Sequence, residues 1–281
     1  MHGVKLCLAL NDHFPLEREE QIRTLRQIGF EGFFSNWRSS ADVTKLRKVA
    51  DEEGMIYQSI HAPFQKMDRL WEKTEETEPA IQTQLECLRA CADNGIPLMV
   101  AHAFIGFLKH QPTQEGLENF ERMVREAEKL GVRIAFENTE GEEYLAALME
   151  HFRGNSTVGF CWDSGHEMCY NHSKDMLALY GDRLLGTHLN DNLGIRDYQG
   201  RITFLDDLHL LPFDGIADWQ KIADRLNQHG FDGILTFELL NFSKPNRHEN
   251  DAYQQMDIHE YLTLAYMRAC RVAALKMRGH I

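Results

Sequence analysis

Acidic and imidazole side chains end four successive apolar runs in the second half of the sequence. Glu137 ends RIAFE, Asp163 ends VGFCWD, His188 ends LLGTH and Glu238 follows GILTF. Three carboxylates packed together would repel one another and lose hydration, at a cost of several kcal/mol, unless some were protonated or a cation lay among them. The cation is the simpler explanation, so we interpret these four residues as ligands of a divalent metal ion.

These polar residues must be brought together by the elements that carry them. Apolar runs that suit buried strands cover residues 4–10, 32–37, 55–61, 96–102, 133–138, 158–163, 184–190 and 233–239. Amphipathic helical patterns such as LENFERMVREAEKLG lie between them. This alternation predicts an α/β fold, a (β/α)8 TIM barrel formed by residues 1–281 as a single domain. The carboxyl ends of barrel strands share one face, so the four polar side chains should converge there.

Glycines and long loops mark the ends of the expected elements. A glycine in the left-handed conformation commonly ends a helix, and five helical patterns are followed by one: Gly29, Gly54, Gly95, Gly131 and Gly230. The longest strand-to-helix connections span residues 191–216 and 241–255. Loops of this length on the catalytic face usually act as lids or substrate walls, so we expect both to line the site.

Charge and composition narrow the classes of partner. The 281-residue chain has a formal net charge of −13, which disfavours attraction to nucleic-acid phosphates and anionic membranes. The opening MHGVKLCLALND fits a first strand better than a signal peptide, and no segment approaches the roughly 20 apolar residues of a membrane span. The six cysteines lack CxxC spacing and lie in apolar patterns, as expected of buried thiols in a reducing compartment. We therefore expect a cytoplasmic protein without membrane contact.

Five further candidate ligands lie at the ends of other apolar runs or in the longest connection. They are His61, His102, His166, Asp207 and His209. Oxygen ligands with one imidazole suit Mn²⁺, Mg²⁺ or Co²⁺, whereas additional imidazoles favour Zn²⁺. These five residues could bind substrate oxygens, or they could extend the site from one metal ion to a second or third.

Several short motifs occur in a fixed order along the chain. They are HAPF at 61–64, FEN at 136–138, CWDSGH at 161–166, THLND at 187–191, DLH at 207–209 and FEL at 237–239. In this order they resemble the xylose isomerase-like TIM-barrel superfamily, which includes the sugar phosphate isomerases and epimerases and the endonuclease IV family. The resemblance covers nearly the whole chain. The motifs are more specific for the superfamily than for any one reaction.

The resemblance to the ketose 3-epimerase-like members implies a site with one metal ion. In those proteins the residues that match the first four candidates hold one divalent cation. Carried over to this chain, Glu137 and Glu238 are also the catalytic acid/base pair, and His166 contacts the substrate.

The resemblance to the endonuclease IV-like members implies a different chemistry. There, the residues that match all nine candidates hold a cluster of three zinc ions that serves phosphodiester cleavage in abasic DNA. This sequence has a matching residue at each of the nine positions. Related barrels also dehydrate cyclic polyols with a similar ion, so a metal-dependent dehydratase is a further alternative.

The charges expected around the site favour proton transfer on a small molecule. That reaction requires a cation to hold the developing enediolate and carboxylates beside the reacting carbon, whereas DNA cleavage also requires loops that grip phosphate backbones. The basic residues of the two long connections, Arg196, Arg201, Lys244 and Arg247, are few and interspersed with acidic ones. Epimerase-like members commonly place an arginine shortly after the residue matching His188, and here the nearest one is Arg196.

These observations together predict a divalent-metal-dependent isomerase or epimerase that acts on a small sugar, polyol or sugar phosphate through enediolate-type proton transfer. Aromatic residues that could form a wall for a sugar ring, although each also suits core packing, are Phe14, Trp37, Phe64, Phe104 and Trp162. A barrel that only binds a partner is a third hypothesis, which the electrostatic cost of the acidic cluster disfavours. Family members often form dimers or tetramers, so the resemblance leaves self-association open.

Overall fold

Eight parallel strands form the centre of the molecule. The computed structural model describes residues 3–108, 111–195 and 201–278. The strands are β1 (Leu6–Ala9), β2 (Gly32–Asn36), β3 (Ile56–His61), β4 (Leu98–His102), β5 (Arg133–Glu137), β6 (Val158–Asp163), β7 (Leu184–His188) and β8 (Leu235–Phe237). Their order in the sheet is β7-β6-β5-β4-β3-β2-β1-β8. Beyond the end of β7, Leu189 donates to the carbonyl of Thr236 (2.8 Å) and accepts from the N–H of Glu238 (3.2 Å), which brings β7 and β8 together and confirms the predicted (β/α)8 barrel.

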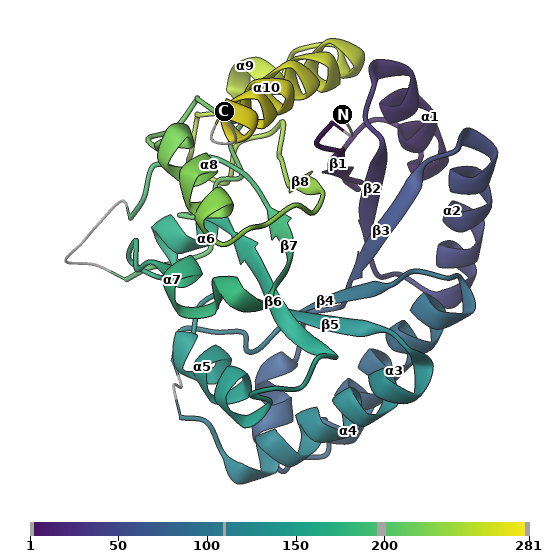
Figure 1. Cartoon of the computed structure of the whole chain (residues 1–281), viewed down its shortest axis with the longest axis vertical. Helices are drawn as coiled ribbons and strands as arrows, with labels where there is room; N and C mark the ends of the chain where they lie inside the picture. Colours follow the sequence, from purple (N-terminus) through teal and green to yellow (C-terminus); the bar gives the residue numbers. More distant parts are fainter. Residues whose placement is uncertain (1–2, 109–110, 196–200, 279–281) are drawn as a thin grey trace.

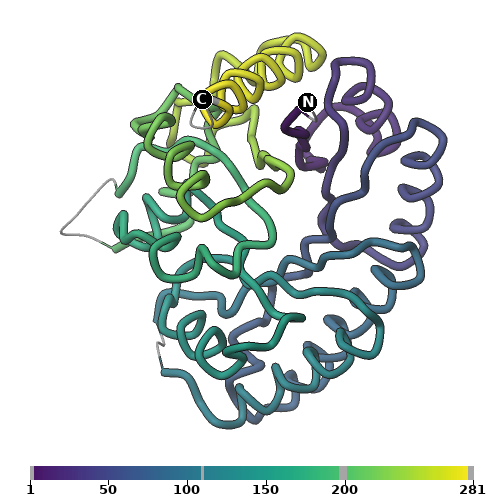
Figure 2. Tube along the Cα trace, in the orientation of Figure 1, coloured from purple at the N-terminus to yellow at the C-terminus, as the bar shows by residue number. Residues whose placement is uncertain are grey.

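Helices surround the strands (Figure 1). They are α1 (Arg18–Ile28), α2 (Ser40–Glu53), α3 (Thr77–Asp93), α4 (Gln114–Leu130), α5 (Glu142–His151), α6 (Ser164–Cys169), α7 (Met176–Tyr180), α8 (Trp219–Gln228), α9 (Asp251–Gln254) and α10 (Ile258–Arg278), with 3₁₀ turns at Met67–Trp71 and Gly181–Arg183. The trace runs once around the barrel, so the first and last elements lie side by side (Figure 2), where β1 pairs with β8. No helix in the described ranges has both the length and the apolar composition needed to cross a bilayer.

Helix α4 illustrates how the sequence defines an outer helix. Its buried residues Phe120, Met123, Val124 and Ala127 recur at the spacing of one helical face. At its start, the Thr113 side chain accepts from the N–H of Gly116 (3.1 Å), a cap of a kind worth about 1 kcal/mol. The helix is followed by Gly131, which is one of the five glycines predicted to end helices. All five have positive φ. The punctuation expected from the sequence is therefore confirmed.

Apolar side chains fill two zones, one between strands and helices and a smaller one inside the barrel. Fully buried Phe33, Phe136 and Phe237 belong to the outer zone, whereas Val100 and Cys161 belong to the inner one. The sheet register then decides which residues reach the carboxyl-end face at the same height. The polar side chains that follow the apolar part of each strand are brought to that face as a layer.

Candidate functional site

The four residues that end the last strands lie together, as expected. Glu137 ends β5, Asp163 ends β6, His188 ends β7, and Glu238 directly follows β8. One ligand atom from each lies within 4.8 Å of those of the other three. The register pairs Asp163 with His188 and His102 with Glu137, so these residues share a layer of the barrel. Three carboxylates and an imidazole at this spacing could hold one cation.

Glu137 is the residue that faces the most imidazoles. Its Oε1 lies 2.8 Å from Nδ1 of His188, and its Oε2 lies 3.2 Å from Nε2 of His61 and 3.4 Å from Nε2 of His102. Burial raises the pKa of the Glu137 carboxyl, but the charge of His188 and the hydrogen bonds from the three imidazoles outweigh burial and hold this pKa well below its ordinary value. A buried carboxylate that faces ligands through both oxygens can bridge two cations.

Three histidines use one ring nitrogen on the main chain. His61 Nδ1 lies 2.8 Å from the carbonyl oxygen of Ala62. His166 Nδ1 lies 3.1 Å from the carbonyl oxygen of Asn138, and His209 Nδ1 lies 3.2 Å from that of Glu238. A carbonyl oxygen can only accept a hydrogen bond, so each Nδ1 must carry a proton. In a neutral ring, the Nε2 atom then presents a lone pair.

Each of these Nε2 atoms is aimed at a carboxylate. Nε2 of His61 faces Glu137, Nε2 of His166 lies 3.4 Å from Oδ1 of Asp207, and Nε2 of His209 lies 3.0 Å from Oδ2 of Asp207. Two lone pairs at this distance repel unless the ring is protonated or a cation lies between them. Burial lowers the pKa of His209, but Asp207 outweighs burial and raises that pKa to about 9.

The spacing and chemistry of these donors fit a metal ion. Metal-binding histidines typically donate their other ring N–H to a carboxylate or a main-chain carbonyl, as these three do. Ligands about 2 Å from a shared ion lie roughly 3 to 3.5 Å apart. The structure therefore brings together all nine candidate residues in three groups: Glu137, Asp163, His188 and Glu238; His61, His102 and Glu137; and His166, Asp207 and His209.

Two asparagines, which sequence reasoning did not single out, hold Asp163. Nδ2 of Asn190 donates to both Asp163 carboxylate oxygens (3.2 and 2.9 Å), and Asn138 exchanges two hydrogen bonds with the Asp163 main chain (2.8 and 2.9 Å). Burial and the nearby carboxylates, such as Glu137, raise the pKa of Asp163 to about 6. The sequence did contain a clue, because each asparagine closely follows a candidate ligand at the end of a strand. Asn138 lies in the FEN motif and Asn190 in the THLND motif.

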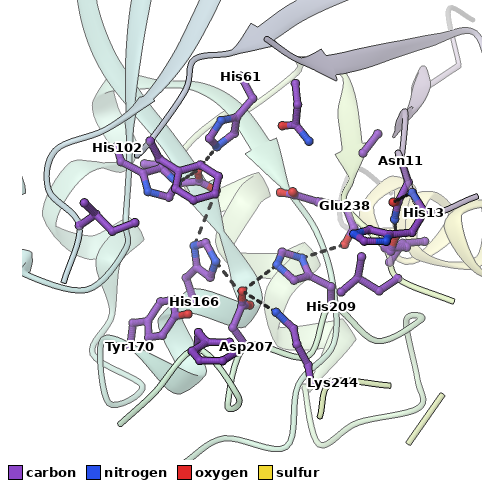
Figure 3. A pocket seen from close by; sticks show the side chains of 18 of the residues that line it. Asn11, His13, His61, His102, His166, Tyr170, Asp207, His209, Glu238 and Lys244 are labelled. Atoms are coloured by element: carbon purple, nitrogen blue, oxygen red, sulfur yellow. Dashed lines mark hydrogen bonds and ion pairs between the residues drawn. The ribbon is translucent and has the colours of Figure 1, made fainter. Parts of the chain in front are cut away.

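The candidate ligands open into a cavity of ≈ 600 Å³. In Figure 3, His166, His209 and Lys244 point toward Asp207, and His61 and His102 lie on another side of the same cavity. Both long connections line it, as predicted: Phe204, Asp207 and His209 come from the first, and Phe242 and Lys244 come from the second.

Lysine and arginine side chains are scarce in the lining of this cavity. Lys244, whose Nζ lies 3.7 Å from Oδ2 of Asp207, is the one lysine or arginine among the described lining residues. Arg247 instead pairs with Glu249 (2.7 Å), and Arg201 lines a neighbouring hollow. Arg196 lies outside the described residues. The scarcity of lysine and arginine agrees with the expectation of a small ligand.

The aromatic wall differs from the one expected. Of the five candidate side chains, Phe64 lines the cavity, with its ring 5.0 Å from that of His102 and nearly parallel to it. Phe14, Phe104 and Trp162 are buried in the core, and Trp37 packs against it. The remaining aromatic lining residues are Phe107, Tyr170, Phe204 and Phe242. A sugar ring could stack on one of these aromatic side chains.

Comparison with known proteins identifies the family. An uncharacterised protein of Sinorhizobium fredii is 27% identical, with 80% of this chain and 84% of that protein covered. D-psicose 3-epimerase from Clostridium cellulolyticum H10 has a TM-score of 0.71 at 14% identity, covering 97% and 99% of the two chains. 3-Keto-D-glucoside 4-epimerase from E. coli has a TM-score of 0.67 at 17% identity, covering 95% of this chain and 100% of that chain. Residues 22–258 match the family described as xylose isomerase-like TIM barrel. The chain therefore belongs to the xylose isomerase-like TIM barrel family.

Proposed function

We propose that the chain is a divalent-metal-dependent isomerase or epimerase of a small carbohydrate, polyol or sugar phosphate. The main support is the group of three carboxylates and one histidine beside a cavity of ≈ 600 Å³ whose described lining carries one ammonium group and no guanidinium. A cavity of this volume suits a small ligand. Two solved structures of the same fold are named as sugar epimerases.

Glu137, Asp163, His188 and Glu238 would hold the cation. When bound, it would polarise a substrate carbonyl and stabilise negative charge on the adjacent oxygen. The two glutamates differ in their access to a substrate, because the Glu238 side chain is 22% exposed and that of Glu137 is fully buried. Glu238 is therefore the side chain better placed to take a proton from a carbon atom.

The charge of Glu238 suits the role of a base. Burial raises the pKa of its carboxyl, but His209 and His188 outweigh burial and lower that pKa to about 2. Glu238 is consequently ionised at neutral pH and can accept a proton. Glu137, which is also held ionised, would first accept a proton from a substrate hydroxyl group and then donate it to the enediolate. His166 would bind a substrate oxygen at the cavity wall.

Exchange of carbon-bound hydrogen tests the proposed proton transfer. Protein loaded with Mn²⁺ is incubated with a panel of ketoses and ketose phosphates in D₂O, and loss of the signal of the proton next to the carbonyl is followed by NMR. Glu238→Gln should slow exchange by about 100-fold or more with an unchanged circular dichroism spectrum. Glu142→Gln is the control, because Glu142 is exposed and pairs with Lys174 outside the metal groups. Wild-type protein that binds metal but exchanges no proton in any sugar of the panel would contradict the proposal.

A second candidate function, metal-dependent hydrolysis of a phosphodiester, is favoured by a specific observation. The five residues beyond the first group also converge at ligand spacing, and Glu137 faces both His188 and the pair of His61 and His102. Clustered cations could activate a water molecule and stabilise a leaving oxygen. The acidic lining, with Asp12 and Glu140, disfavours duplex DNA and leaves a small phosphodiester as the better substrate class.

Metal content and hydrolysis distinguish the two candidates. Elemental analysis counts the ions per chain, while bis(p-nitrophenyl) phosphate and a DNA duplex with an abasic site probe hydrolysis. About three zinc ions per chain with hydrolysis and without proton exchange would replace the first proposal. About one ion with proton exchange would support it.

A further inference from the structure

Asp191 is a buried carboxylate that lies outside the metal-binding groups. It follows His188 by three residues in the THLND motif, and its side chain has no exposed surface. Oδ1 accepts hydrogen bonds from the main-chain N–H groups of Asn192 (2.9 Å) and Ala217 (3.0 Å). Oδ2 accepts from the N–H of Phe213 (2.9 Å) and from Nε1 of Trp219 (2.8 Å). Three of these four donors, Phe213, Ala217 and Trp219, lie near the start of α8, so Asp191 ties the beginning of the long connection to its end.

The main chain of Asp191 holds the residue next to His209. Asp191 N–H donates to the carbonyl of Leu210 (2.9 Å), and Leu210 N–H donates to the carbonyl of Asp191 (3.0 Å). His209 itself has a φ of 48°, a left-handed conformation that is unfavourable for a residue with a Cβ atom. Such a conformation persists where surrounding contacts impose it, and the paired hydrogen bonds at Leu210 supply one such constraint.

Asp207 is held from the same point of the chain. Nδ2 of Asn192 donates to the carbonyl of Asp206 (2.9 Å), and Ile216 N–H donates to the carbonyl of Asn192 (2.9 Å). A Cβ atom at Gly215 would lie 2.2 Å from Oδ1 of Asp191, so the turn has closed onto this carboxylate. The residues that flank Asp207 and His209 are thus bonded to positions 191 and 192.

We propose that Asp191 is a positioning residue that holds Asp207 and His209 in place for cation binding with His166. The inference rests on the second candidate function, because it requires a cation at His166, Asp207 and His209 in addition to one at the first group. The two ligands belong to a connection between β7 and α8 rather than to a strand, so the barrel alone does not fix where they reach. The hydrogen bonds to Asp191 hold the described part of this connection beside Asp207 and His209 without a cation.

Zinc binding in the absence of substrate tests this role. Metal-free wild type and Asp191→Asn are titrated with Zn²⁺ against a chromophoric chelator. Asparagine keeps the shape of aspartate, but its amide N–H₂ would face two of the four N–H donors. Zinc affinity at the group of His166, Asp207 and His209 should fall by about 10-fold to 100-fold. Asp214→Asn is the control, because Asp214 lies in the same connection but pairs with Arg268, and its affinity should stay within about twofold of wild type.

A double-mutant cycle separates positioning from a general loss of structure. If Asp191 acts through Asp207 and His209, then Asp191→Asn should not weaken further the zinc binding that remains in an Asp207→Ala/His209→Ala background. Additive losses, or Asp191→Asn binding zinc as wild type does, would overturn the inference. It would also be overturned if His209→Ala left zinc binding unchanged. Wild-type protein that binds no zinc would instead contradict the second candidate function.

A second variant covers the case in which Asp191→Asn does not fold. Trp219→Phe removes one of the four donors and leaves the carboxylate in place. It should weaken zinc binding roughly threefold to tenfold, while circular dichroism and cooperative thermal unfolding confirm the fold. Unchanged zinc affinity in a folded Trp219→Phe protein would count against the role of Asp191.

Discussion

Replacing Glu137 with glutamine should weaken metal binding more than replacing Glu238. Glu137 contributes an oxygen atom to the group with Asp163 and to the group with His61, whereas Glu238 contributes to the first of these alone. Glu137→Gln therefore removes one negative charge from two neighbouring sites. The substitution also replaces one carboxylate oxygen with an N–H₂ group. This group can neither accept a hydrogen bond from the imidazoles that face it nor bind a cation together with them.

The size of the effect follows from charge and burial. A pair of unit charges about 4 Å apart is worth about 4 kcal/mol at an effective dielectric constant of about 20, and about 1.4 kcal/mol corresponds to a factor of ten in affinity. The glutamine keeps one oxygen that can still bind an ion, so part of this energy is retained. We expect zinc or manganese to bind Glu137→Gln about 100-fold more weakly at both groups.

Competition with a chelator measures this difference directly. Metal-free wild type, Glu137→Gln and Glu238→Gln are titrated with the same ion at the same pH, and Glu142→Gln serves as the exposed control. Turnover should be lost in both site variants. If Glu137→Gln bound metal with an affinity within about threefold of that of wild type, Glu137 would not be a ligand. The inference from the two Glu137 oxygens, each of which faces histidines, would then be wrong.

Two other perturbations test ion pairs outside the groups of candidate ligands. Arg225 donates two hydrogen bonds to the Glu167 carboxylate, at 2.7 and 2.9 Å. Glu167→Ala would leave this guanidinium buried with weaker partners, so it should lower the free energy of unfolding by about 2–4 kcal/mol. A loss of less than about 1 kcal/mol in urea denaturation would contradict this expectation. Arg122 holds Glu78 through two bonds of 2.8 Å and lowers the pKa of that carboxyl from 4.5 to about 2. Because the folded pKa is depressed, the stabilisation is present above about pH 4.5 and is lost as the pH falls toward 2. Glu78→Gln should therefore cost less than about 1 kcal/mol at pH 7 and progressively less below pH 4.5, and a loss that grows on acidification would refute the assignment.

The periodic part of the fold followed from the sequence. The strand β6 has the predicted bounds, because turns and polar residues flank its apolar run on both sides. The strand β8 is shorter than predicted, 235–237 instead of 233–239, because it pairs with β1 only from Leu235 to Phe237. A run of apolar residues shows that a strand exists, but its partner decides how many residues are bonded.

The candidate ligands were predictable, but their neighbours were not. The residues at strand ends share a face because barrel geometry requires it, and no such rule orients a side chain in a loop. Phe104 and Phe107 lie in one short segment, yet Phe104 stacks on Tyr144 with ring centres 4.0 Å apart while Phe107 is 37% exposed and lines the cavity. The four bonds to Asp191 likewise depend on turns whose shape no local pattern encodes.

The ligands of the candidate site are distributed along most of the polypeptide, from His61 on β3 to Glu238 after β8. During synthesis on a ribosome, a nascent chain that has emerged only as far as β5 can present just the pair of histidines and Glu137. The complete set exists only after the last strand has left the exit tunnel and docked against β1. The proposed cation could therefore meet all of its candidate ligands only after the barrel has closed.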